Sequence, residues 1–289
     1  MLPAKLLTIR KADEGGIMVS QEIIEKSARI VSGCRHIVAL TGAGISAESG
    51  ISTYRDSGGL WDRYPEGSSG GIVAVMTRHP EDAPQILMGF LNGIRAARPN
   101  PGHHALVDLE RMGYLRAVIT QNIDNLHREA GNSRVFEMHG NIYRFRCLEC
   151  GKKKIMERDK FFETFEKFIS KMKRFSFEEM GSHFPTCPCG GNTRLDAVAF
   201  GEPVQDLNEA MTEAGACDLM LVLGTSGVVY PAASLPGIAK SRGALLVEIN
   251  PRESALSDQC DLFLEGNTGE ILPLIVLSLK EIMVKEGGV

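Results

Sequence analysis

Long runs of apolar residues are missing from this sequence of 289 residues. No stretch approaches the roughly 18 consecutive apolar residues that a membrane-spanning helix requires. Residues 1–17 also lack the apolar core and the small-residue cleavage site of a secretory signal. We therefore expect a loose extension over residues 1–17, no membrane segment and a cytoplasmic location.

Positive charge is not in excess either. Lysine and arginine together number 32, aspartate and glutamate number 36, and the formal net charge is −4. Because nucleic-acid binding usually needs a basic face, this balance argues against direct contact with DNA or RNA. A content of 43% hydrophobic and 24% charged residues is ordinary for a globular protein. The length allows one large domain or two smaller ones.

Cysteines are few and odd in number, which argues against a framework of disulfides. Of the seven, four form two tight pairs, Cys147 with Cys150 and Cys187 with Cys189. Four thiolates are the ligand set of a closed tetrahedral zinc site, and a zinc ion with no open position is structural. Because nothing indicates export, a metal site is favoured over disulfides. Thiols without metal, or His183 as a different fourth ligand, are the alternatives.

Short apolar runs alternate with helical patterns along most of the chain. The runs typical of strands are His36–Leu40, Leu115–Thr120, Leu219–Leu223 and Ala244–Ile249. The segments with helical spacing are 21–32, 102–112, 205–216, 231–241 and 268–285. Strands that are apolar on successive residues suit a parallel sheet covered on both faces. The pattern predicts an α/β fold with a Rossmann-like open parallel sheet.

Two segments interrupt this alternation and predict a second, smaller lobe. Residues 51–100 are rich in loops before they turn helical, and residues 147–193 enclose a charged helical stretch between the cysteine pairs. We expect one domain over residues 18–289. Its Rossmann-like lobe would comprise about 18–54, 101–146 and 194–289, and its zinc-binding and helical lobe about 55–100 and 147–193, with a cleft between them.

A glycine-rich turn, residues 41–50 (TGAGISAESG), follows the first predicted strand. Glycines let a pyrophosphate approach the backbone, and a helix after the turn would present its amide groups to the anion. A hydride-transfer enzyme also needs an acidic residue about 20 positions further on, at the end of a second strand. Asp62 has that spacing but stands in a loop sequence, so this class is disfavoured. A simple tight turn is the alternative, while the polar loop around Arg55 predicts a lid over a ligand.

Polar side chains follow the second predicted strand. Residues 120–127 (TQNIDNLH) contain three carboxamides and a carboxylate, which are costly to bury unless they bind something. A ribose or a carboxamide ligand would satisfy them, although a helix cap formed by Asp124 or Asn122 is an equal alternative. His139, beside Gly140 after an apolar run, is a candidate general base near physiological pH. Taken alone, a structural histidine is the commoner case.

Together and in this order, these segments resemble the sirtuin family of NAD-dependent protein lysine deacylases. The resemblance covers about residues 20–285, nearly the whole chain. It is carried by GAGISAESGI (42–51) with Arg55, TQNID (120–124), HG (139–140), the four cysteines, FGE (200–202), GTS (224–226), VVYPAA (228–233) and EIN (248–250).

The resemblance implies roles for individual residues. His139 would be the catalytic base, and Asn122 would hold the reacting ribose. The NAD site would be formed by Gly42, Ala43, Gly44, Ile45, Glu48, Tyr54, Arg55, Gln121, Ile123, Asp124, Gly224, Thr225, Ser226, Asn250, Asn267 and Thr268. An acylated-lysine peptide would be held as an added strand by Phe200, Gly201, Glu202, Val228, Val229 and Tyr230. The zinc held by Cys147, Cys150, Cys187 and Cys189 would be structural.

The reaction that the resemblance implies releases nicotinamide, O-acyl-ADP-ribose and free lysine. Members of the family that remove acidic acyl groups carry a Tyr-x-x-Arg pair, whereas Phe90-Leu91-Asn92-Gly93-Ile94-Arg95 has no tyrosine. We therefore expect an acetyl or a longer apolar acyl group on the lysine. Leu195-Asp196 and Ala199 also depart from the family pattern.

Two other functions compete with this expectation. The same pocket would serve an NAD glycohydrolase or an ADP-ribosyltransferase, since the acyl side of the motif is altered at Ala199. A non-catalytic NAD-binding module is the other possibility, with the phenylalanines of the insert 151–186 holding a partner. Packing of that insert as an amphipathic helix on the zinc-binding lobe is the simpler interpretation.

Overall fold

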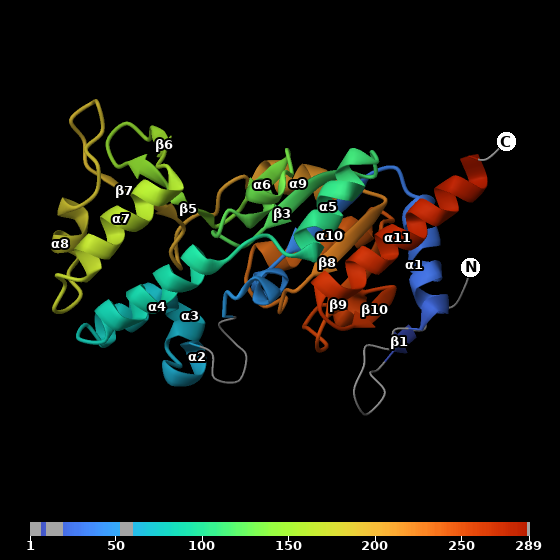
Figure 1. Ribbon diagram of the computed structural model, residues 1–289, viewed down its shortest axis with the longest axis horizontal. Helices are drawn as coiled ribbons and strands as arrows, with labels where there is room; N and C mark the ends of the chain where they lie inside the picture. The colour runs from blue at the N-terminus through green and yellow to red at the C-terminus, as the bar shows by residue number, and fades with distance from the viewer. Residues whose placement is uncertain (1–6, 10–19, 53–59, 288–289) are drawn as a thin grey trace.

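The computed structural model describes residues 7–9, 20–52 and 60–287. Its main feature is a seven-stranded sheet in the order β1-β10-β9-β8-β2-β3-β4, in which every pair is parallel (Figure 1). The strands are β1 (Leu7–Ile9), β2 (Ile37–Thr41), β3 (Leu115–Thr120), β4 (Val135–Glu137), β8 (Leu219–Leu223), β9 (Leu245–Asn250) and β10 (Leu262–Glu265). This order is the Rossmann-like arrangement, so the predicted fold class is confirmed.

The four strands predicted from apolar runs are all present, with bounds within about one residue of those expected. Strand β2 is buried along its whole length. Ile37 and Ala39 pack into the core on one face of the sheet, and Val38 and Leu40 pack into the core on the other. Strands β4 and β10 are too short to give a clear pattern in the sequence.

The amino-terminal segment differs from the expectation. Leu7–Ile9 form β1, which pairs in parallel with β10 at one edge of the sheet. The expectation of a loose extension over residues 1–17 is therefore wrong for these residues. A strand this short shows no periodicity, and its partner lies far away in the sequence, so local patterns cannot reveal the pairing.

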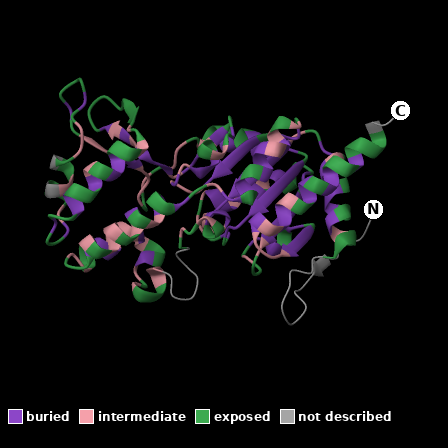
Figure 2. Cartoon of the chain, viewed as in Figure 1, coloured by how far each residue is buried: buried purple, intermediate pink, exposed green. Residues whose placement is uncertain are grey.

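Helices cover both faces of the sheet and leave it buried between them (Figure 2). One face is covered by α1 (Gln21–Ser32), α5 (Pro101–Arg111) and α11 (Thr268–Gly287), and the other by α9 (Leu207–Ala216) and α10 (Leu235–Ser241). The connections contain η1 (Ala43–Ser49), α6 (Leu126–Ala130), η2 (Ala232–Ser234) and η3 (Ser257–Gln259). The strand order reverses between β2 and β8, and open parallel sheets bind ligands at such a switch point.

A second lobe lies at one end of the molecule, at the left of Figure 1. Its antiparallel sheet, in the order β6-β5-β7, consists of β5 (Gly140–Cys147), β6 (Lys153–Ile155) and β7 (Thr193–Ala197). The helices of this end are α2 (Leu60–Arg63), α3 (Gly67–Arg78), α4 (Ala83–Ala96), α7 (Arg158–Ile169) and α8 (Phe177–Ser182). Because β5 begins at Gly140, this sheet starts before the lobe boundary expected after residue 146.

Helix α7 packs its phenylalanines into the core of the second lobe. Phe161 and Phe165 stack with their ring centroids 4.4 Å apart, and Tyr143 of β5 meets Phe161 and Phe162 edge-on. Phe168 is buried as well. The insert 151–186 therefore contributes a structural amphipathic helix, which is the simpler of the two interpretations of its sequence.

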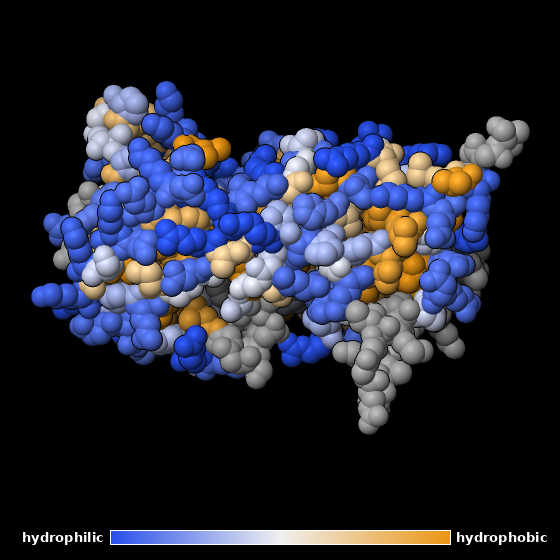
Figure 3. All heavy atoms as spheres, in the orientation of Figure 1, coloured by the Kyte–Doolittle hydropathy of each residue, from blue (hydrophilic) through white to orange (hydrophobic). Residues whose placement is uncertain are grey.

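Among the described residues, no helix combines the length and the apolarity needed to cross a bilayer. Helix α11, with 20 residues, packs against α1 and α5 on its inner side. Its outer side exposes Leu274, Leu277, Met283 and Val284. Figure 3 shows hydrophobic atoms gathered over this helix on a face that is otherwise largely hydrophilic.

Candidate active site

The glycine-rich turn lies where β2 ends, against the loop that follows β8. Gly42 N–H donates to Leu223 O (3.1 Å), and Gly44 N–H donates to Gly224 O (2.8 Å). A Cβ on Gly44 would lie 2.7 Å from Gly224 Cα, so no side chain fits between the two loops. The turn continues directly into a helix, as expected, and this helix is η1, of the 3-10 type. The glycines are thus required by the close approach of two loops at the switch point.

Asn122 and Asp124, just after β3, are tied to the same turn. Asn122 Nδ2 donates to Gly42 O (2.9 Å) and to Ser46 Oγ (3.1 Å), and Ser46 Oγ donates to Asp124 Oδ2 (2.7 Å). Asp124 Oδ1 accepts from Leu126 N–H (2.9 Å), so it also holds the start of α6, as the helix-cap alternative predicts. Burial raises the pKa of Asp124 above its ordinary value. One buried carboxylate therefore joins the glycine-rich turn to the segment that follows β3.

His139 follows β4 and has one ring nitrogen fixed by the chain. Its Nδ1 lies 2.8 Å from Gln121 O, and because a carbonyl oxygen only accepts, Nδ1 carries the proton. Nε2 is then the unprotonated nitrogen of the neutral ring. Burial lowers the pKa of His139, and the bond to Gln121 opposes this shift only in part. The imidazole is therefore neutral at physiological pH, with Nε2 able to accept a proton.

Amide and hydroxyl side chains gather at the ends of β3, β8 and β9. Gln121 Nε2 donates to Thr225 Oγ1 (2.9 Å). Asn250 Nδ2 donates to Thr225 O (2.9 Å) and to Glu248 Oε1 (3.2 Å), which leaves its Oδ1 as the atom suited to accept from a ligand hydroxyl. Ser226 is exposed beside them. The edge thus offers both donors and acceptors for a polyhydroxylated ligand.

Glu48 forms a hydrogen bond with a distant part of the chain that its sequence context does not reveal. Its Oε2 accepts from Gly269 N–H (2.7 Å) at the start of α11. A carboxylate is favoured there because the amino end of a helix carries a partial positive charge. Asn267 and Thr268, both predicted to bind NAD, lie at the same end of α11, and Thr268 is buried. The three residues therefore share one corner of the sheet edge, where Glu48 already holds the helix.

The remaining residues predicted for the NAD site differ in their exposure. Ile45 belongs to the main core, whereas Ala43 and Ile123 are half-buried and have surface to offer a ligand. Tyr54 and Arg55 lie outside the described residues, so the predicted lid stays a prediction.

Large apolar side chains are exposed in the segments predicted to hold a peptide. Phe200 is 50% exposed, Val228 47% and Tyr230 73%, while Val229 is half-buried. Exposed apolar side chains of this size are typical of binding surfaces. The Phe200 ring also packs over Gly71 of α3, where a Cβ would lie 2.8 Å from it. The ring thus connects the two lobes.

Glu202, also predicted to bind the peptide, is used inside its own loop. Its carboxylate pairs with Arg194 and accepts from Ala199 N–H (3.1 Å). Gly201 at the tip of this turn has a φ of +88°, which favours glycine. Glu202 therefore shapes the loop that carries Phe200.

A buried polar layer beneath the edge is not apparent from the sequence. Asn122 N–H donates to Thr120 Oγ1 (3.1 Å), and Thr41 Oγ1 donates to the same oxygen (2.8 Å). His127 Nε2 lies 2.9 Å from Thr41 Oγ1, and its ring centroid is 4.8 Å from that of His103. Burial lowers the pKa of His127 to about 4 and that of His103 to about 2, so both rings are neutral. The place of His103 within the helical pattern 102–112 was the available signal for its burial.

Asn100 is a second residue that sequence reasoning misses. Its Nδ2 donates to Ile45 O (2.6 Å) and to Ser49 Oγ (3.0 Å), and its Oδ1 accepts from Gly102 N–H (2.9 Å). It therefore caps α5 and holds η1 at the same time. The signal was an asparagine directly before Pro101, which marks the first position of a helix.

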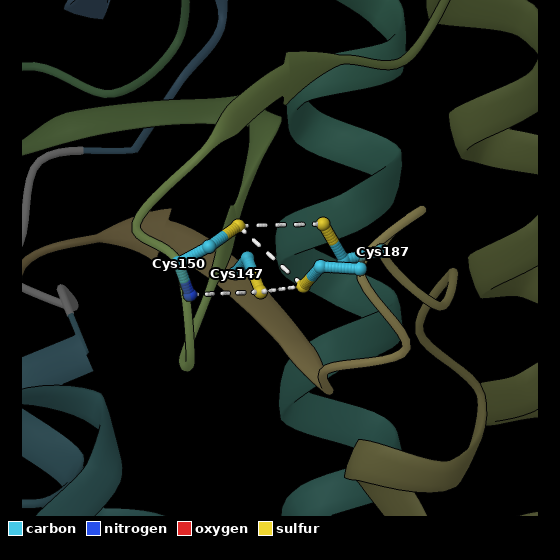
Figure 4. Close-up of side chains that lie close together, drawn as sticks. Cys147, Cys150 and Cys187 are labelled. Carbon is cyan, nitrogen blue, oxygen red and sulfur yellow. Dashed lines mark hydrogen bonds between the residues drawn. The ribbon is translucent and has the colours of Figure 1, made fainter.

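The four paired cysteines converge in the second lobe, and Figure 4 shows the sulfur atoms of Cys147, Cys150 and Cys187 pointing toward one another. Their Sγ atoms and that of Cys189 all lie within 4.8 Å of each other. The Cys147–Cys189, Cys150–Cys187 and Cys150–Cys189 contacts measure 3.6, 3.7 and 3.5 Å. Tetrahedral zinc with bonds of about 2.3 Å separates its sulfurs by about 3.8 Å. The thiolates thus fit zinc, and His183 packs on Phe168 instead.

Comparison with known proteins agrees with this geometry. A family model described as the Sir2 family matches residues 42–231. The chain belongs to the Sir2, or sirtuin, family. This sirtuin is 46% identical over 263 residues to an NAD-dependent protein deacylase of Desulfosudis oleivorans, covering 90% of this chain and 96% of that protein. It is 41% identical over 265 residues to an NAD-dependent protein deacylase of Pyrococcus abyssi, covering 90% of this chain and all of that protein (100%).

Solved structures place this sirtuin in the same fold. A Sir2 homologue in complex with NAD is 34% identical and superposes with a TM-score of 0.70, covering 93% of this chain and 97% of the other. A Sir2–p53 peptide–NAD+ structure is 32% identical, with a TM-score of 0.68 and coverage of 93% and 98%.

Proposed function

We propose that this sirtuin is an NAD-dependent protein lysine deacylase that removes an acetyl or a longer apolar acyl group. The observation that carries the proposal is the tautomer of His139. Its neutral ring carries the proton on Nδ1, because Nδ1 donates a hydrogen bond to Gln121 O. This leaves Nε2 as a base beside the polar edge of the switch point. The deacylase names of relatives at 41–46% identity support the same activity.

The residues at this edge suit NAD, because hydroxyl, carboxamide and backbone groups match a dinucleotide with two riboses. When bound, NAD supplies the labile bond between nicotinamide and ribose that makes the ribose reactive toward the acyl oxygen. We assign Gln121 and Asn122 to the ribose, and Ile123 and Asp124 to the carboxamide of nicotinamide. Nε2 of His139 takes a proton from a ribose hydroxyl, while Nδ1 stays on Gln121 O and keeps the ring oriented.

The remaining site residues are assigned to the other parts of NAD and to the peptide. The turn at Gly42–Ile45 and the segment Gly224–Ser226 approach the phosphates and the adenosine half, with Asn250, Asn267 and Thr268 beyond them. Glu48 acts by holding α11 in place. Phe200–Glu202 and Val228–Tyr230 receive the acylated peptide as an added strand, a mode that gives affinity through backbone pairing and little choice of sequence.

Zinc bound by the four cysteines would hold the second lobe together. Four thiolates would leave the ion no open position, so the metal would be structural and would take no part in the reaction. The bound metal would join β5 with the segment before β7, because Cys147 ends β5 and Cys187 and Cys189 precede β7.

An apolar acyl group is favoured by what surrounds helix α4. Leu87 and Phe90 pack into the same cluster as Ile51 and Ile123, which lie beside the glycine turn and the carboxamide segment. Arg95, the candidate for binding an acidic acyl group, donates to Glu166 of α7 (3.0 Å) and stacks over Phe162. A carboxylate on the acyl chain would therefore meet apolar side chains and lose its hydration without a partner.

We further propose that residues 18–289 form one catalytic domain of two lobes, acting in the cytoplasm on acylated-lysine proteins, without direct contact to nucleic acid. The support for a cytoplasmic location is the cysteine set, in which all seven cysteines are free thiols and four of them are arranged for a metal.

Purified protein mixed with NAD and acetyl-lysine peptide tests the proposal. We expect release of nicotinamide only when the acylated peptide is present, and equal amounts of free lysine peptide. Cleavage of NAD without peptide would instead identify a glycohydrolase or a transferase with another acceptor. A panel of acetyl, succinyl and long-chain acyl peptides then ranks the acyl groups, and a succinyl preference would contradict the apolar assignment.

A further inference from the structure

The loop of residues 198–205, which carries Phe200, begins and ends on the segment of His139. Val198 N–H donates to His139 O (2.9 Å). Gln205 N–H donates to Met138 O (2.9 Å). The two ends of the loop are therefore joined to adjacent residues, one of which is the base. We call these two anchoring ends, together with the side chains that link them, the neck of the loop.

A buried carboxylate closes this neck. Asp196 is 1% exposed and stands on β7, two positions before Val198. Its Oδ1 accepts from Gln205 Nε2 (2.8 Å), and its Oδ2 accepts from Arg144 Nε (2.5 Å). Gln205 Oε1 in turn accepts from Lys153 Nζ and Arg144 Nη2. The pair Asp196–Gln205 therefore joins the strand that enters the loop to the residue that leaves it.

The same network returns to the strand before His139. Arg144 Nη1 donates to Glu137 Oε2 (2.7 Å), and Glu137 is the last residue of β4. The contacts thus form a closed ring that runs from Glu137 through His139, Val198 and Asp196 to Arg144 and back. A charge this deeply buried is held by partners with good geometry, and removing one partner leaves the others unsatisfied.

We propose that Asp196 and Gln205 are positioning residues that couple the peptide-holding loop to the base. Neither residue is assigned to NAD or to the peptide. With the neck closed, Phe200–Glu202 is held ready to pair with a peptide, and the same bonds fix the backbone of His139. With the neck open, the loop must be ordered when the peptide binds, and this cost weakens peptide binding. The inference rests on the proposed deacylase function for its kinetic consequences and on the geometry alone for the neck itself.

The kinetic test compares three variants with the wild type. Gln205→Leu removes the donor to Asp196, and Gln205→Glu places a second carboxylate opposite it. The double variant Asp196→Asn/Gln205→Glu exchanges donor and acceptor at an unchanged total charge. We expect each single variant to lower kcat/KM for acetyl peptide about tenfold, the size expected for a lost hydrogen bond to a buried charge. The KM for NAD should stay within about twofold, and the double variant should recover most of the loss.

Gln21→Glu is the matched control, because Gln21 Nε2 donates to Glu25 Oε1 (3.2 Å) on the exposed face of α1, far from the site. It makes the same chemical change, and all kinetic constants should stay at their wild-type values. If the neck had a merely structural role, the single variants would raise the KM values for NAD and peptide together. The double variant Asp196→Asn/Gln205→Glu would then not restore these values. Either result, or unchanged kinetics in Gln205→Leu, overturns the proposal.

Hydrogen exchange tests the neck without relying on activity. In Gln205→Leu, the backbone amides of Val198 and of position 205 should exchange at least about tenfold faster, while those of β3 keep their protection. The double variant should restore slow exchange. If the wild type acts on no acyl peptide, the proposed function fails. The hydrogen-exchange result alone then shows whether Gln205 closes the neck. Unchanged exchange in Gln205→Leu refutes it in either case.

Discussion

Replacing His139 with asparagine is expected to stop deacylation while the fold is kept. Asparagine Nδ2 can take the place of His139 Nδ1 as donor to Gln121 O, but the side chain offers no base in the place of Nε2. Loss of a general base costs about 10²–10⁴-fold in rate, or about 2.7–5.5 kcal/mol of transition-state stabilisation. The change therefore separates chemistry from structure.

His139→Ala serves as the comparison, because it loses the base and the hydrogen bond together. Leaving Gln121 O without its donor costs about 1 kcal/mol, which lowers the Tm by roughly 2–4 °C. The asparagine variant should melt within about 1 °C of the wild type. Both variants should bind NAD with nearly unchanged Kd in calorimetry, since His139 contacts Gln121 only at its backbone carbonyl and every side chain assigned to the dinucleotide is kept.

The assay follows free lysine peptide by mass spectrometry as a function of pH. The reaction needs the neutral imidazole, and burial lowers the pKa of His139 from its ordinary 6.5. The acidic decline of the wild-type kcat/KM should therefore have its midpoint below pH 6.5. In His139→Asn this acidic decline should disappear from the small residual rate. Deacylation at the wild-type rate by the asparagine variant would refute the assignment of His139 as the base.

Three further predictions concern other parts of the chain. His103 and His127 have pKa values of about 2 and 4 when folded, against 6.5 when unfolded, so the unfolded chain binds more protons below pH 6.5. As the pH falls from 6 to 4.5, each should therefore lower the free energy of unfolding by about 1.4 kcal/mol per pH unit. When the free energy of unfolding from urea titrations is plotted against pH, His103→Gln should show a shallower dependence on pH than the wild type. Cys150→Ser should reduce bound zinc below one equivalent in metal analysis and lower the Tm, and full zinc retention would contradict the four-thiolate site. Arg95→Ala should leave the ratio of acetyl to succinyl rates unchanged in peptide assays, because the guanidinium is held by Glu166; a changed ratio would place it in the acyl site.

The parts of the fold that the sequence predicts well are those with a repeated local pattern. The strand at Leu115–Thr120 contains the apolar run Ala117–Ile119 and its bounds are correct, and α5 starts at the proline that marks its first turn. Strand β4 spans only Val135–Glu137, and its place depends on pairing with β3, so no local signal defines it. The same reason accounts for the missed pairing of Leu7–Ile9.

The candidate site divides along a similar line. Residue types and order indicate the glycine turn, the carboxamide segment and His139, because each type suits one piece of chemistry. Sequence cannot show that Glu48 binds the start of α11 or that Asn100 holds Ile45, because these contacts join segments distant in the chain. The network of Asp196 is of the same kind: a residue noted only as unusual becomes a buried partner of Arg144 once β5 and β7 pair.

The pairing of β1 with β10 has a practical consequence for anyone who shortens this protein. A version beginning at residue 20, where the first clear helical pattern starts, would leave the outer backbone amides and carbonyls of Leu262–Leu264 without partners. An uncovered strand at the border of a sheet invites pairing with another molecule. Such a version should associate as its concentration rises, whereas a purification tag attached after residue 289 would leave this border covered.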